Sequence, residues 1–176
     1  MRWRGTLVLG VLLGTVVGGR APIAAEGATT ILIHMKTGLK QDNAQISAAY
    51  NQIWAALAEG LNVRVLVDAS AVHIYKKGGV NGWEDLEGHR LPESLRKILA
   101  QDFGVHVAEI PRTYGDYLRM LRDKGAKFYV NSEMLVTAKI ESALGRTENL
   151  GPPFFTPVGP REMFRLWREA HLYMVY

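Results

Sequence analysis

Two short apolar runs with a helical segment between them decide the fold. The first run is Thr30–Met35, TILIHM, and the second is Val63–Asp68, VRVLVD. Both are rich in β-branched residues, as expected for strands that are buried on both faces of a sheet. Between them, Asp42 and Gln45 form a capping-box-like pair, apolar residues recur at helical spacing, and Gly60 ends the pattern. This order predicts a βαβ unit with a parallel strand pair and a right-handed crossover.

The remainder of the chain repeats this alternation. The spacing of apolar residues predicts strands at 126–130 and 172–176, and helices at 92–104, 113–125, 131–145 and 160–170. The segment 151–159 is rich in proline and glycine, so we expect a loop there rather than the interior of a sheet. The segment 76–112 is either a loop insertion or an extra strand–helix unit, because residues 105–110 alternate only briefly. We predict an α/β fold with an open, mostly parallel, five- or six-stranded sheet and helices on both faces.

The first 25 residues predict a cleaved secretory signal peptide. Arginines lie within the first four residues, Gly5–Gly19 is an uncharged run, and small residues follow up to Ala25. The uncharged run is shorter than the roughly 20 residues that a membrane-spanning helix needs. We prefer cleavage after Ala25, and cleavage after Gly27 or an uncleaved anchor are the alternatives. We expect a periplasmic or secreted protein with a single α/β domain over 26–176, which contacts a membrane only if the leader is uncleaved.

The charge balance argues against nucleic acid as a partner. The chain has 21 Lys and Arg against 17 Asp and Glu, which gives a formal net charge of +4. Arg2, Arg4 and Arg20 belong to the leader, so 18 against 17 leaves about +1 for the mature chain. Nucleic-acid binding requires a concentrated basic patch, which this balance does not indicate.

The chain contains no cysteine. This excludes disulfides, thiol nucleophiles, thiolate metal sites and persulfide carriers. The sequence also has no Gly-x-Ser-x-Gly elbow, no Walker loop and no His-Glu-x-x-His motif. We therefore predict no cofactor and assign no catalytic residue.

Several segments carry a family resemblance. They are Ile31–Gly38 with the Ala-rich helix after it, Val63–Val72, and Leu118–Leu121 with Gly125–Asn131. Together with a last strand that follows an Ala-bearing helix, they resemble the DsrE/DsrF-like sulfur-relay family over most of 30–176, apart from about 76–112. The resemblance implies a flavodoxin-like, DsrE-like fold and assembly into homo- or hetero-oligomers.

The best-known members of that family pass persulfide sulfur through a cysteine at the end of the strand predicted at 126–130. A thiol at a helix N-terminus has a lowered pKa, which activates it. In this chain the corresponding residue is Asn131, and the position of a second family cysteine is Met134. The resemblance thus implies a relative without sulfur transfer by this route, in which a cysteine introduced at Asn131 would be activated.

A candidate ligand-binding pocket lies at the carboxyl ends of the predicted strands, where open parallel sheets bind ligands at a switch point. It gathers residues from the loop after the first strand and from the end of the strand at 126–130: His34, Lys36, Thr37, Gly38, Asn131, Ser132 and Glu133. A helix N-terminus with Lys36 nearby suits a small anion. In the simpler interpretation, Asn131 and Ser132 are helix N-caps and His34 is a hydrogen-bonded structural residue.

We predict no metal site. His34, Met35 and Met134 form a weak copper-like candidate, because thioether ligands suit Cu(I) in an exported protein. Six methionines in 176 residues are not an enrichment, so composition adds no support.

Two classes of function follow. The first is an exported DsrE/DsrF-like protein that acts as a binding or assembly module linked to sulfur or redox metabolism. Its expected partners are further copies of the chain, together with a protein partner or a small anionic ligand. The alternative is an enzyme of unknown reaction, or a small-anion or metal-binding protein, that uses the pocket around His34, Lys36 and Asn131. The two classes differ in whether His34, Lys36 and Glu133 converge.

Overall fold

The computed structural model describes residues 29–176 except 40, 79–85 and 87, so the predicted leader lies outside the described residues. The elements in chain order are β1 Thr30–Met35, α1 Asn43–Ala58, β2 Asn62–Val67, η1 Ala69–Tyr75, α2 Glu93–Asp102, η3 Val107–Glu109, α3 Tyr114–Asp123, β3 Lys127–Asn131, α4 Ser132–Thr137, β4 Thr156–Val158, α5 Pro160–Glu169 and β5 Leu172–Val175. Among the described residues, none of these helices has the length and hydrophobicity needed to cross a bilayer.

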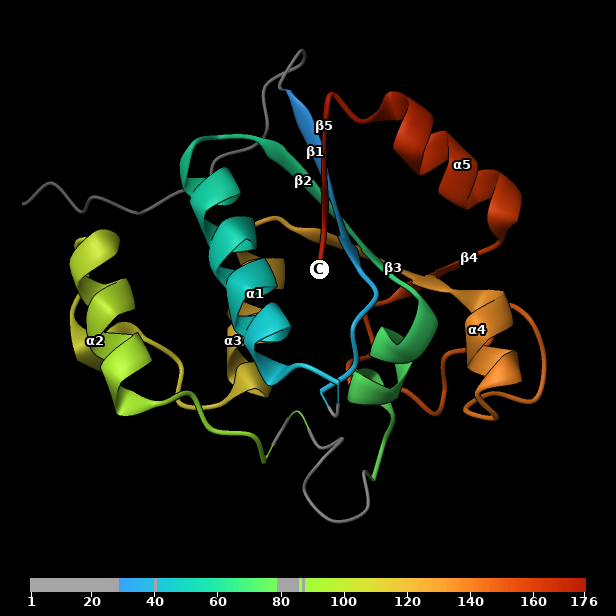
Figure 1. The fold of residues 1–176 in the computed structure, drawn as a ribbon, viewed down its shortest axis with the longest axis horizontal. Helices are drawn as coiled ribbons and strands as arrows, with labels where there is room; N and C mark the ends of the chain where they lie inside the picture. The colour runs from blue at the N-terminus through green and yellow to red at the C-terminus, as the bar shows by residue number, and fades with distance from the viewer. Residues whose placement is uncertain (1–28, 40, 79–85, 87) are drawn as a thin grey trace, which may run out of the picture.

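The sheet confirms the predicted fold class. Its five strands lie in the order β4-β3-β2-β1-β5, and every pair of neighbours is parallel. Figure 1 shows α1, α2 and α3 on one side of this sheet and α5 on the other. The chain is therefore an open α/β fold with helices on both faces, consistent with a flavodoxin-like sheet.

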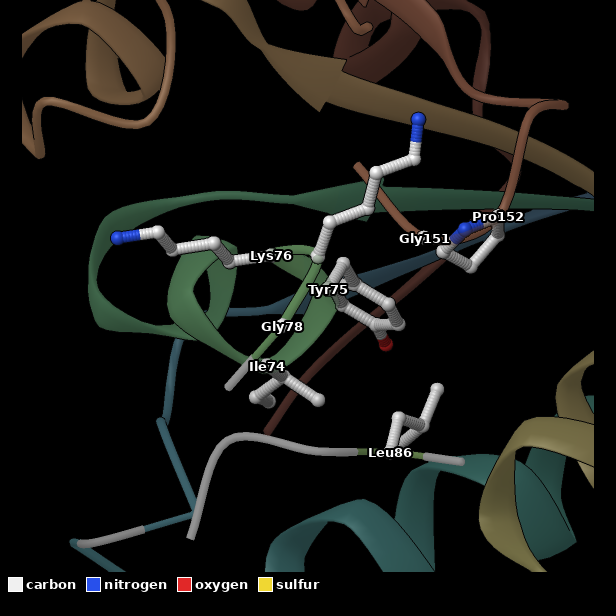
Figure 2. Close-up of a pocket in the computed structure, with 8 residues that line it drawn as sticks. Ile74, Tyr75, Lys76, Gly78, Leu86, Gly151 and Pro152 are labelled. Carbon is white, nitrogen blue, oxygen red and sulfur yellow. The ribbon is translucent and has the colours of Figure 1, made fainter. Parts of the chain in front are cut away.

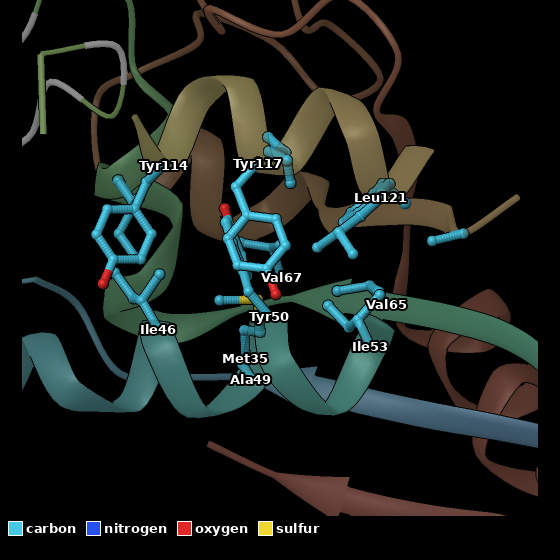
Figure 3. Packing of buried hydrophobic residues seen from close by; sticks show 14 of the residues in the cluster. Met35, Ile46, Ala49, Tyr50, Ile53, Val65, Val67, Tyr114, Tyr117 and Leu121 are labelled. Atoms are coloured by element: carbon cyan, nitrogen blue, oxygen red, sulfur yellow. The ribbon is translucent and has the colours of Figure 1, made fainter. Parts of the chain in front are cut away.

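The two faces of the sheet bury cores of different size. The larger core lies under α1 and α3, where Tyr50 and Ile53 of α1 meet Tyr117 of α3 over Val65 of β2 (Figure 3). The smaller core lies under α5 and contains Leu32, Leu66, Val158, Met163 and Leu166. Because α5 is the helix that packs on this second face, the sheet surface is covered less completely there.

The predicted helix starts are confirmed at the caps. The side chain of Asp42 accepts a hydrogen bond from the amide of Ala44, and Thr113 accepts one from the amide of Asp116. Pro160 lies in the first turn of α5, where its missing N–H costs nothing. These caps satisfy backbone donors that a helix leaves free at its first turn.

The predicted helix from 131 to 145 is wrong in its length. It ends at Thr137, and Leu144, near the end of the predicted range, is 64% exposed. Lys139 has a left-handed φ of 55°, its amide donates to Val136, and the amide of Ile140 donates to Leu135. This is a Schellman ending, in which glycine is usual, so a lysine there gave no signal in the sequence.

Two elements, η1 and β4, were not predicted from the sequence, and the structure resolves the two alternatives for 76–112. The 3₁₀ helix η1 follows β2 directly, and β4 forms within the proline-rich segment expected to be a loop. β4 is an edge strand, which is the place in a sheet that tolerates Pro157. In the described part of 76–112 the regular elements are α2 and η3, so this segment adds a helix and no strand.

Candidate functional site

The strand order places a switch point between β1 and β5. The connection from β1 to β2 runs through α1 on one face of the sheet, and the connection from β4 to β5 runs through α5 on the other. The two connections therefore leave a junction at the carboxyl ends of β1 and β5. This is the position at which open α/β sheets place their sites.

His34 is buried at this junction, near the end of β1. Its ring Nδ1 lies 2.7 Å from the hydroxyl of Tyr173 on β5, and its Nε2 lies 3.2 Å from Oδ2 of Asp68, just after β2. An ionised carboxylate only accepts, so in the neutral ring Nε2 carries the proton and Nδ1 accepts from the tyrosine hydroxyl. The ring centroid of Trp167 on α5 lies 6.0 Å from that of His34, so α5 packs over the histidine.

Asp68 links His34 to the next strand. Its Oδ1 accepts hydrogen bonds from the side-chain amide of Asn131 at 2.8 Å and from the backbone amide of Ala69 at 2.7 Å. The hydrogen bond with His34 is the largest cause that lowers the pKa of Asp68 from 3.8 to about 2, and Asn131 and Ala69 lower it further against the effect of burial. Asp68 is thus held ionised at the centre of a chain of hydrogen bonds.

The backbone beside Asp68 is strained. Ala69 has a φ of 49°, in the left-handed region that L-residues rarely adopt. Such conformations cost on the order of 1–2 kcal/mol and persist where the surroundings determine them. The amide of this strained residue donates to Oδ1 of Asp68, the same oxygen that accepts from the side chain of Asn131.

Asn131 is the N-cap of α4, as the simpler interpretation predicted. Its side-chain oxygen accepts from the amides of Glu133 and Met134, while its side-chain nitrogen donates to Asp68. Ser132 accepts from the amide of Gly145 instead of capping α4. Both ends of the Asn131 amide therefore have partners within the chain.

The loop after β1 also uses its backbone amides internally. The amides of Lys36 and Thr37 both donate to the carbonyl oxygen of Tyr176, at 2.6 and 3.2 Å. The amide of Gly38 donates to the hydroxyl of Ser70 and to the side chain of Gln41. The N–H groups expected to hold an anion thus have partners supplied by the protein.

The predicted site residues are only partly brought together. His34 and Asn131 are joined through Asp68, whereas Lys36 and Glu133 are exposed outside this chain of hydrogen bonds. Met35 points to the opposite face of the sheet, where its sulfur accepts from Tyr75, so it does not share a site with His34. The described residues contain no group of three His, Cys, Asp or Glu placed to hold a metal.

Asp68 and Tyr173 were not predicted as site residues. Asp68 is the last residue of the run VRVLVD, and a carboxylate just after a buried strand was the available signal. Tyr173 gave none, because only the strand order shows that β5 lies beside β1. We call Tyr173, His34, Asp68 and Asn131 the strand-end network.

Two clefts lie elsewhere on the described surface. One, of about 130 Å³, lies at the end of η1, where Figure 2 shows Ile74 and Tyr75 facing Leu86. The other, of about 320 Å³, lies between α5 and the strands β2 to β4 and is lined by pairs of opposite charge such as Arg64 and Glu169. Neither cleft is lined by a residue of the strand-end network.

The lowered pKa of Asp68 predicts a pH dependence of stability. A carboxyl with a lower pKa in the folded state stabilises the protein above its unfolded pKa, and that contribution is lost as pH falls from about 5 toward 2. We expect Asp68→Asn to be less stable than the wild type by about 1–2 kcal/mol at pH 7. Urea unfolding at several pH values should show the difference shrink steadily as pH falls from about 5 toward 2. A constant difference from pH 7 to pH 2 would contradict the assigned role of Asp68.

No family model matches the chain, and no curated protein matches it. The resemblance to the sulfur-relay family stays a prediction.

Proposed function

We propose that the chain is an exported, cysteine-free DsrE/DsrF-like protein that works by association rather than by carrying sulfur. It acts as a binding or assembly module linked to sulfur or redox metabolism. The support from the fold is the open parallel sheet, and the support from the sequence is the order of segments that resembles the family.

One observation carries the proposal. Asn131 stands where sulfur-carrying members have their cysteine, and its amide both caps α4 and donates to the Asp68 carboxylate. Neither an asparagine nor any other side chain of this chain can form a persulfide, because the sequence has no cysteine. The position therefore serves to hold the strand ends together.

The contacts around the strand ends support association over ligand chemistry. The amides of Lys36 and Thr37 donate to Tyr176, and His34 uses both ring nitrogens within the strand-end network. A site that binds a small ligand keeps a few polar groups free to orient it. Here the loop amides of Lys36 and Thr37 and both ring nitrogens of His34 have partners in the chain.

A second candidate function is an enzyme, and the line Asp68–His34–Tyr173 favours it. A hydroxyl bonded to an imidazole that a carboxylate orients is the arrangement of nucleophilic and acid–base sites. Tyr173 is half-exposed as a residue, but burial and then the negative charge of Asp68 raise the pKa of its hydroxyl above the usual 10.0. Because a raised pKa disfavours the ionised, nucleophilic form of the tyrosine, the line Asp68–His34–Tyr173 favours a structural role over a catalytic one.

Export and assembly can be tested in one sample. The gene should be expressed from its own start codon in a bacterium with an intact envelope, and the protein purified from that envelope. Mass spectrometry should show an N-terminus near Glu26. Light scattering at micromolar concentration should give at least twice the mass of the monomer that begins there. An N-terminus at Met1 would contradict the cleaved leader. A clean monomer would contradict assembly.

A further inference from the structure

Large exposed apolar side chains are concentrated on α5 and β5, where strand alternation places Leu172 on the α1 side of the sheet and Tyr173 and Val175 on the α5 side. Seven large hydrophobic residues are exposed in the described part of the chain, and five of them lie on α5 and β5. These five are called the edge patch: Phe164, Trp167, Leu172, Tyr173 and Val175. An apolar group on an edge strand and its neighbouring helix is the kind of surface that marks an interaction site.

The backbone of β5 also has groups that point away from the sheet. The amide of Tyr176 donates to His34 of β1, and its carbonyl accepts from Lys36. In a parallel pair, alternate residues of a strand bond to its neighbour. The backbone groups of Leu172, Met174 and Tyr176 therefore face β1, and those of Tyr173 and Val175 face the free edge, meaning the side of β5 on which no other described strand lies.

The other edge of the sheet is poorly suited to pairing. β4 has three residues, and Pro157 at its centre has no N–H to donate. Short edge strands and proline are the usual protection against added strands. β5 is one residue longer than β4 and contains no proline, and its sequence LYMV has no charge that would repel a second strand.

We propose that two copies of this chain pair through β5, antiparallel, about a two-fold axis at Met174. This register places Tyr173 of each copy opposite Val175 of the other, so the two outward-facing residues form two pairs that each exchange two hydrogen bonds. An aromatic residue opposite a β-branched one is a favourable cross-strand pair. The result is a single sheet that runs through both subunits. The inference rests on the proposed function and names the partner.

The size of the edge patch fits this occupant. Its five residues are between 39% and 62% exposed, which leaves roughly 400–500 Å² of side-chain surface if an aromatic side chain offers 150–250 Å². A standard interface buries about 800 Å² per partner, so the patch and the paired backbone supply most of one. Pairing also covers Tyr173, whose hydroxyl bonds to His34, so the second copy completes the burial of the strand-end network.

Substitutions at Val175 test the pairing without altering the bonds to β1. Val175→Pro removes an N–H that faces the free edge, and Val175→Lys places a charge against the second copy. We expect each to raise the dimer dissociation constant at least tenfold in analytical ultracentrifugation of the purified full-length gene product. Ile98→Lys is the matched control, because Ile98 is an equally exposed apolar residue, at 55%, on α2. It should leave the dissociation constant unchanged.

Hydrogen exchange of the wild type gives an independent readout if a variant does not fold. The amides of Tyr173 and Val175 should exchange slowly at concentrations where the protein is dimeric and fast after dilution to monomer. Fast exchange in the oligomer, or an unchanged mass in both Val175 variants, would overturn the β5 interface and leave the proposed assembly function standing. A wild-type monomer at all concentrations would overturn both. If the protein instead co-purified with a different polypeptide bound to β5, the proposal that a second copy occupies this edge would be overturned.

Discussion

Asp68→Ala is expected to lower the free energy of unfolding by about 3 kcal/mol, because it leaves His34, Asn131 and the Ala69 amide without their common acceptor. At about 2–4 °C per kcal/mol for a domain of this size, Tm should fall by roughly 6–12 °C. Differential scanning calorimetry at pH 7 measures the shift.

The matched control for this variant is Asp123→Ala. Asp123 is a surface aspartate that pairs with the adjacent Arg122, and exposed pairs of this kind contribute about 0–1 kcal/mol. If Asp68→Ala changed Tm no more than Asp123→Ala does, the strand-end network would not stabilise the fold.

Asn131→Cys is expected to give an unreactive thiol, whereas the resemblance to the sulfur-relay family predicts an activated one. A thiolate there would lie beside the Asp68 carboxylate. In the wild type, Oδ1 of Asp68 is 2.8 Å from the side-chain nitrogen of Asn131, which the substitution removes. Two like charges about 4 Å apart repel by about 4 kcal/mol at an effective dielectric constant of 20, whereas a helix N-terminus contributes about 0.3–1 kcal/mol. Because the repulsion by the carboxylate is larger than the stabilisation by the helix N-terminus, the thiol pKa should lie above the unperturbed value of about 8.5.

The rate of iodoacetamide alkylation against pH measures this effect, with a cysteine peptide as reference. At pH 7.5, Asn131→Cys should react at least about tenfold more slowly than the peptide, since each pKa unit above ambient pH lowers the thiolate fraction about tenfold. Replacing Asp68 with asparagine in the same variant should restore the rate to that of the peptide or higher. A single Asn131→Cys variant that reacts faster than the peptide would show that the site keeps the electrostatics of a sulfur carrier.

The sequence predicted the elements whose signals are local. The strands at 30–35 and 126–130 and the cap Asp42 depend on hydrophobic runs and on side chains within a few residues, and the structure confirms them. The end of α4 was missed because Lys139 adopts a conformation that sequence rules assign to glycine. β4 was missed because the sheet interior excludes proline while its edge accepts it.

The site was less predictable than the fold, because its contacts are long-range. His34 and Tyr173 are 139 residues apart in sequence, and Asn131 and Asp68 are 63 apart. The position of His34 and Asn131 at the strand ends followed from the parallel sheet. The partners of the loop amides could not be predicted in the same way, because Tyr176 reaches Lys36 only through the pairing of β5 with β1.

The most direct test of the account is whether the strand ends bind a small anion. Two-dimensional amide NMR of the purified wild-type protein should be recorded during separate titrations with sulfate, phosphate and thiosulfate. If the chain's own groups occupy the site, the signals of Lys36, Thr37 and Gly38 should show no saturable shift with any of the three. A saturable shift of these amides would contradict the account and make the strand ends a ligand site.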